Sequence, residues 1–170
     1  MDTVERKYTA KEAMQSVVEY LKDDAVRATQ VITIRTISES ERKLFVRMFS
    51  HWLHKNRERI FLLADSVSSL QMLQQRIEAR CKGIKIVETA TLEEHGISDD
   101  MILNRINGAE ADCVIASLPQ EVEDRFVQQN RKSLNAKVWF GLGCGKDWKQ
   151  EKTWYEKIAK VVSEVTSKKK

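Results

Sequence analysis

A short glycine-rich run is the strongest chemical feature of the sequence. Three of the six glycines lie between Gly141 and Gly145. Glycine lets the backbone approach a ligand closely, and successive free N–H groups can form a nest that binds an anion. The run matches neither the GxGxxG fingerprint nor a P-loop that ends in GKS or GKT. We predict that Gly141, Gly143 and Gly145 contact a phosphate-bearing ligand. The alternative is a tight turn between a strand and a helix.

A second set of polar residues surrounds Pro119, the single proline of the chain. Ser117 precedes it, and Gln120 and Glu121 follow it. Amide and carboxylate oxygens of this kind can accept hydrogen bonds from ribose or sugar hydroxyls. Proline is also common in the first turn of a helix, so the alternative is an ordinary helix start.

Asp65 and Ser66 follow the apolar run Ile60–Ala64. Either residue is a good N-cap for the helix that we predict to begin there. A carboxylate at a helix N-terminus occupies the place that would otherwise attract an anion. We therefore expect Asp65 to weaken the binding of a diphosphate at this position.

The histidines and cysteines predict no metal site. His51 and His54 have the spacing of ligands on one helix, but no third ligand is evident. The three cysteines are Cys81, Cys113 and Cys144, an odd number without CxxC spacing, which suits a reducing compartment. Cys144 lies in the glycine run, but it has no histidine nearby in the sequence to activate it as a nucleophile.

The elements that must position these residues alternate between strand and helix. Strands are predicted near 30–34, 60–64, 84–88, 112–116 and 136–141. Helices between them carry apolar stripes, which include Leu44 in the second helix and Val67 in the third. Because the connections are too long for hairpins, the strands should be parallel. We predict an α/β fold, an open and mostly parallel sheet of about five strands with helices on both faces, similar to a Rossmann fold. Ligands bind such sheets at the carboxyl ends of the strands.

Composition and charge favour a single cytoplasmic α/β domain over residues 1–170. The chain has no apolar run near the ~20 residues that span a bilayer. Residues 146–170 contain eight lysines and four acidic residues, whereas residues 1–145 are neutral. We predict a basic helical segment at 149–170 that contacts a membrane surface or is simply a solvated helix with a frayed lysine end. We expect no nucleic-acid partner, and we leave open whether the chain forms a homo-oligomer.

The order of the loops resembles the WecG/TagA/CpsF glycosyltransferase family, which transfers N-acetylmannosamine or related sugars from UDP-sugars to lipid-linked acceptors. The segments that carry the resemblance are Tyr8–Ala13, Gln30–Thr33, Phe61–Asp65, Ile102–Ile106, Ala111–Ala116, Pro119–Glu121 and Lys137–Trp148. The resemblance implies a UDP-sugar and a lipid-linked or other acceptor as partners, a place peripheral to the inner face of the membrane, and no cofactor. It implies a nucleotide-sugar site formed by Thr33, Asp65, Ser66, Ser117, Gln120, Glu121, Gly141, Gly143 and Gly145.

The sequence also departs from the family pattern. No Asp-Gly pair occurs in the chain, although the family's proposed base lies in such a motif. Arg35 stands where the first family motif has Asn, and Ala64 and Asp65 replace two glycines. Catalytic residues therefore stay unassigned, with Asp65, Glu121 and Asp147 as the carboxylates to consider. The first interpretation is a divergent hexosaminyltransferase. The alternative is a catalytically inactive relative that binds a nucleotide-sugar or a protein partner.

Overall fold

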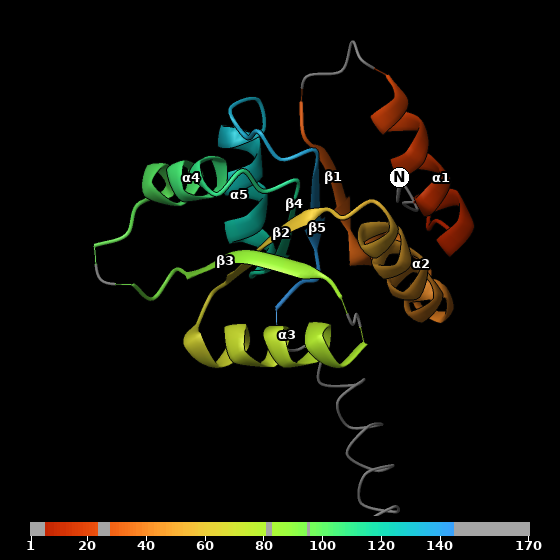
Figure 1. The fold of residues 1–170 in the computed structure, drawn as a ribbon, viewed down its shortest axis with the longest axis horizontal. Coiled ribbons are helices and arrows are strands. Elements are labelled where there is room, and N and C mark those ends of the chain that lie inside the picture. Colours follow the sequence, from red (N-terminus) through yellow and green to blue (C-terminus); the bar gives the residue numbers. More distant parts are fainter. Residues whose placement is uncertain (1–5, 24–27, 81–82, 95, 145–170) are drawn as a thin grey trace, which may run out of the picture.

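The computed structural model describes residues 6–23, 28–80, 83–94 and 96–144. Gly145, Asp147 and the basic segment 149–170 lie outside the described residues. Within them, five strands form one all-parallel sheet with the order β1-β5-β4-β2-β3 (Figure 1). The strands are β1 (Gln30–Thr33), β2 (Arg59–Ala64), β3 (Lys85–Thr91), β4 (Cys113–Ser117) and β5 (Val138–Gly141). The predicted open parallel sheet is thus confirmed.

Five α-helices of the described part of the chain surround the sheet. They are α1 (Ala10–Lys22), α2 (Arg42–Lys55), α3 (Val67–Arg80), α4 (Asp99–Gly108) and α5 (Gln120–Asn130). Two short 3-10 helices, η1 (Ile34–Thr36) and η2 (Glu39–Glu41), connect β1 to α2. Hydroxyl caps fix where two of the helices begin, because Thr9 accepts a hydrogen bond from the Glu12 N–H and Ser98 accepts one from the Met101 N–H.

The sheet separates two hydrophobic cores. Helices α1, α2 and α3 cover one face, where Phe45, Phe49 and Leu73 pack on Ile60 and Leu62. Helices α4 and α5 cover the other face. Figure 1 shows these two groups of helices on opposite sides of the strands. Strand β2 is buried on both faces, which explains its continuous apolar sequence.

Two residues of the predicted apolar stripes are exposed. Leu44 is 43% exposed and Val67 is 51% exposed. In α2 the buried face is centred on Phe45, Phe49 and Leu53, and Leu44 is rotated away from it by one residue, about 100°. Val67 is the first residue of α3. The stripe prediction was wrong at these two positions and right for the buried residues of both helices.

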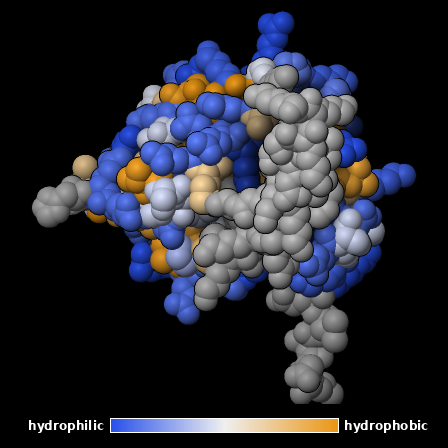
Figure 2. Space-filling model, turned by 90° about the horizontal axis from the view of Figure 1, so that it is seen from below, coloured by the Kyte–Doolittle hydropathy of each residue, from blue (hydrophilic) through white to orange (hydrophobic). Residues whose placement is uncertain are grey.

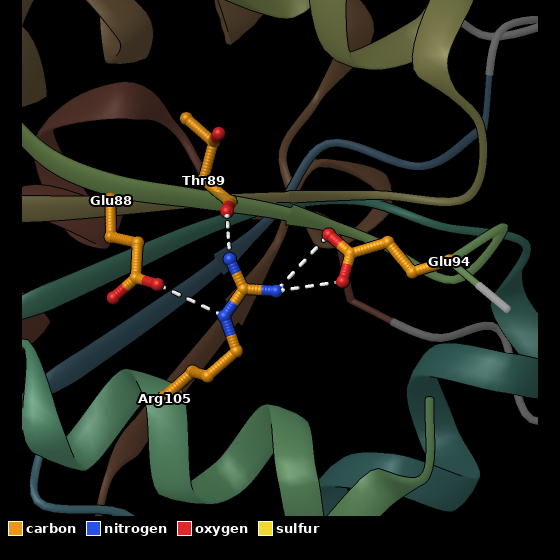
Figure 3. Close-up of polar contacts among 4 residues, drawn as sticks. All are labelled: Glu88, Thr89, Glu94 and Arg105. Carbon is orange, nitrogen blue, oxygen red and sulfur yellow. Dashed lines mark hydrogen bonds and ion pairs between the residues drawn. The ribbon is translucent and has the colours of Figure 1, made fainter. Parts of the chain in front are cut away.

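Arg105 covers the open edge of the sheet at β3. Its guanidinium donates to Glu88 Oε1 at 2.9 Å, to both carboxylate oxygens of Glu94 and to the Thr89 carbonyl at 2.8 Å (Figure 3). The Leu92 N–H pairs with β2, so alternation along the strand turns the Thr89 carbonyl outward. A register shift opposite Ile60 and Phe61 adds a bulge in the same strand. Both features discourage pairing of β3 with another chain.

The surface seen from below in Figure 1 is mainly hydrophilic, with small separate hydrophobic patches (Figure 2). Among the described residues, the large exposed hydrophobic ones are Tyr8, Leu44, Val67 and Met101. None of the helices in the described part of the chain combines the length and apolar character needed to cross a bilayer.

Candidate functional site

The carboxyl ends of β2 and β4 define the crevice where ligands bind in sheets of this type. Strand β2 connects to its neighbour β3 through α3, which covers one face of the sheet. Strand β4 connects to its other neighbour, β5, through α5, which covers the opposite face. The strand order therefore reverses between β2 and β4, and we call this position at the carboxyl ends of the two strands the β2–β4 crevice. The loops that follow these strands contain Asp65, Ser66 and Ser117, three of the predicted site residues.

Asp65 has a buried carboxylate oxygen that the described protein leaves unsatisfied. Its backbone N–H donates to the Ser117 carbonyl at 3.2 Å, which joins the ends of β2 and β4. Its Oδ1 atom is buried, and within the described part of the chain it has no hydrogen-bond partner. Buried polar atoms are nearly always paired, so this oxygen is a ready acceptor for a ligand hydroxyl or N–H.

A different carboxylate occupies the N-terminus of α3. Glu93, from the loop after β3, accepts a hydrogen bond from the Val67 N–H at 3.0 Å. Ser66 accepts one from the Ser69 N–H at 3.1 Å and is the N-cap. The N-cap prediction is confirmed for Ser66. Glu93 adds a negative charge at this helix end that the sequence analysis did not foresee, and the effect of Asp65 on diphosphate binding stays a prediction.

The glycine run is held by the neighbouring strand. The Ser117 hydroxyl donates to the Gly143 carbonyl at 3.0 Å, and the Leu142 N–H donates to the Ala116 carbonyl at 2.8 Å. Gly143 has a φ of +78°, which favours glycine. Ser117 is thus buried and engaged in fixing the loop, and the Leu142 N–H is used within the sheet. Cys144 is a partly exposed free thiol.

Glu123 is a site residue that the sequence analysis missed. It lies in α5, is 2% exposed, and accepts a hydrogen bond from the Trp139 indole N–H at 2.8 Å. A Cβ atom at Gly141 would lie 1.8 Å from Glu123 Oε1, so the absence of a side chain at Gly141 makes room for this carboxyl group. The helical period gave a signal, because Glu123 shares one face with Phe126, Val127 and Asn130.

The charge of Glu123 depends on its surroundings. Burial raises the pKa of its carboxyl group. The Trp139 N–H and the positive charge of Arg35 partly offset this rise, and the nearby Asp124 adds to it. Arg35 belongs to η1, directly after β1, and is partly exposed. The electrostatic contact therefore links the ends of β1 and β5 to the start of α5.

The remaining predicted residues lie around this edge. Thr33 ends β1, pairs with Gly141 across the sheet, and accepts a hydrogen bond through its carbonyl from the Thr36 hydroxyl at 2.7 Å. Gln120 and Glu121 are exposed in the first turn of α5. His51 and His54 lie elsewhere, on the exposed face of α2, with the His54 ring against Gly83.

The comparisons with known proteins agree with this arrangement. A family model described as the glycosyl transferase WecG/TagA/CpsF family matches residues 34–148, more than half of the chain. The matched segment includes the loops after β2, β4 and β5 and begins one residue after Thr33. A search of curated proteins found no match.

Proposed function

The chain belongs to the WecG/TagA/CpsF glycosyltransferase family, and we propose that it binds a UDP-sugar and transfers a hexosamine to a lipid-linked or other acceptor. The observation that carries this proposal is the unsatisfied Oδ1 atom of Asp65 at the β2–β4 crevice. It lies within the matched segment, at the place in the sheet where ligands bind.

Glycosyl transfer with inversion needs a base and a stabilised leaving group. The acceptor oxygen forms a bond to the anomeric carbon as the bond from that carbon to the β-phosphate oxygen breaks. The acceptor proton passes to a carboxylate, and UDP leaves with the bonding electron pair. We assign the proton acceptor to Asp65, because its Oδ1 is free to receive a hydrogen bond. Glu121, which is exposed in the first turn of α5, is the second choice for the proton acceptor.

Calorimetry with UDP and UDP-N-acetylhexosamines, followed by a transfer assay, tests the proposal. Asp65→Asn should keep UDP binding and lower the transfer rate by roughly 10²–10⁴-fold, the usual contribution of a general base. Asp100→Asn is the matched control, because Asp100 is an exposed carboxylate in the first turn of α4. A natural protein that binds none of these nucleotides would contradict the proposal.

A second candidate is a relative that binds a nucleotide-sugar without transferring it. The observation in its favour is Glu93, whose carboxylate occupies the N-terminus of α3 and removes one favourable place for a diphosphate. Tight UDP binding with no transfer to any acceptor, and no effect of Asp65→Asn, would select this candidate.

A lipid-linked acceptor would place the reaction at the cytoplasmic face of a membrane. We propose that residues 146–170 make this contact. They contain eight lysines and four acidic residues, and anionic lipids attract a segment with such an excess of lysine. Sedimentation with anionic vesicles, with and without residues 149–170, tests this part of the proposal.

A further inference from the structure

Among the described residues, the edge of the sheet that carries the candidate site is rich in carboxylates and poor in available cations. Asp65, Glu93, Glu121 and Glu123 all lie at or beside it. Arg105, the nearest arginine to the β3 end, is engaged by Glu88, Glu94 and a backbone carbonyl. A ligand that carries phosphate groups needs positive charge here to offset these carboxylates.

Arg35 supplies such a charge. It follows β1 by two residues, and no hydrogen bond or ion pair engages its guanidinium within the described part of the chain. Its electrostatic contact is with Glu123, which is buried and fixed by Trp139. Lys7 brings a second positive charge, because its Nζ donates to the Arg35 carbonyl at 2.5 Å. The Lys7 ammonium therefore lies at the backbone of Arg35, directly after the end of β1.

The spacing between Arg35 and the β2–β4 crevice fits a ligand that extends along the carboxyl edge of the sheet. Neighbouring strands are ~4.8 Å apart, so the ends of β1 and β4, with β5 between them, are about 10 Å apart. A nucleotide-sugar spans that distance. Gly141 lies between Arg35 and the crevice, and Thr33 pairs with it directly.

We propose that Arg35, supported by Lys7, binds the phosphate groups of the ligand, with Glu123 as the internal counter-charge of Arg35 when the site is empty. The identity of the ligand as a nucleoside diphosphate sugar rests on the proposed function, but the anion site itself does not. Guanidinium suits this role, because its planar donors match phosphate oxygens in pairs.

The electrostatic contact between Arg35 and Glu123 predicts that ligand binding changes the number of protons bound to the protein. When phosphate oxygens pair with Arg35, their negative charge offsets part of the positive charge that lowers the pKa of Glu123. The groups that face it are then Trp139 from β5 and Asp124 from its own helix, and neither carries positive charge. Binding should therefore raise the pKa of Glu123 further and be accompanied by proton uptake, which Glu123→Gln should remove.

Calorimetry with inorganic pyrophosphate, UDP and uridine tests the anion site. Arg35→Ala should weaken pyrophosphate and UDP binding at least tenfold, Arg35→Lys should recover part of the affinity, and uridine binding should stay the same. Arg47→Ala is the matched control, because Arg47 is an exposed cation on α2. Repeating the UDP titrations in two buffers of different ionisation enthalpy measures the proton uptake, with Glu123→Gln beside the natural protein.

The outcomes separate this inference from the proposed function. UDP binding that is equally tight in Arg35→Ala overturns the anion site and leaves the proposed function standing. Pyrophosphate binding that depends on Arg35, without UDP binding, supports the anion site and overturns the UDP-sugar assignment. Binding of neither probe to the natural protein overturns both.

Discussion

The Trp139 indole N–H donates to Glu123 Oε1 at 2.8 Å, and both side chains are almost completely buried. This bond joins α5 to β5 at the carboxyl end of the sheet. The carboxyl group also fills the space that a side chain at residue 141 would need. Gly141 is therefore required by the protein's own packing, in addition to any role toward a ligand.

Gly141→Ala should destabilise the protein by about 1–3 kcal/mol, the usual cost of overpacking a buried position. The new Cβ would lie 1.8 Å from Glu123 Oε1, and the carboxyl group cannot move without losing Trp139. Urea unfolding measures the change. Gly108→Ala is the control, because no atom lies within 4 Å of its Cβ position. The Glu123→Ala, Gly141→Ala double variant should cost less than the sum of the two single variants, and a fully additive cost would contradict the clash.

A group of charged residues at the opposite end of the sheet predicts a pH dependence of stability. Burial raises the pKa of Glu58 to about 7, the proximity of Asp112 adds to the rise, and Lys137 opposes it. Lys137 Nζ lies 3.9 Å from Glu58 and 4.0 Å from Asp112. The folded state therefore holds the Glu58 proton more tightly than the unfolded state does.

The contribution of Glu58 to stability is full below pH 4.5, its ordinary pKa, and is lost as the pH rises through about 7. Glu58→Gln should flatten the profile of unfolding free energy against pH in that window. Glu19→Gln, which changes an exposed carboxylate on α1, should leave the profile unchanged. A profile that Glu58→Gln does not alter would contradict the assignment.

The sequence predicted the sheet because each strand is a local pattern. The runs at Ile60–Ala64 and Cys113–Ala116 are apolar without interruption, which is typical of strands buried on both faces. The connections between them have the length that parallel pairing needs, and they contain the helices that cross over the sheet. The fold therefore followed from information within short segments.

The site was less accessible from sequence because its contacts join distant segments. Glu93 reaches the Val67 N–H across 26 residues, and no local pattern reveals that contact. Glu123 was detectable from the helical period, because it shares one face with Phe126 and Asn130, but the sequence analysis did not consider it. Arg35 was noted only as a departure from the family motif, and its relation to Glu123 needed the packing of η1 near α5.

Arg105 should limit self-association through the edge strand. Arg105→Ala removes its bonds to Glu88, Glu94 and the Thr89 carbonyl. We expect a loss of about 1 kcal/mol in unfolding free energy, since these pairs are partly exposed, and more association at high protein concentration. Unfolding and light scattering measure the two effects. Asn104→Ala changes the exposed neighbour on α4 and is the control. An Arg105→Ala protein that associates no more than the natural protein would show that the bulge alone protects the edge.

Glu93 should oppose the binding of phosphate groups near the β2–β4 crevice. Its carboxylate accepts the Val67 N–H and places negative charge at the N-terminus of α3, where the helix dipole would otherwise favour an anion. Glu93→Gln keeps an oxygen that can accept the same hydrogen bond and removes the charge. Binding of UDP should therefore become tighter by about 0.3–1 kcal/mol, the range for a charge at an exposed helix end. Glu78→Gln, near the other end of α3, should leave UDP affinity unchanged. Weaker UDP binding in Glu93→Gln would instead make Glu93 a ligand-contacting residue, as expected if it accepts a hydrogen bond from a ribose or sugar hydroxyl.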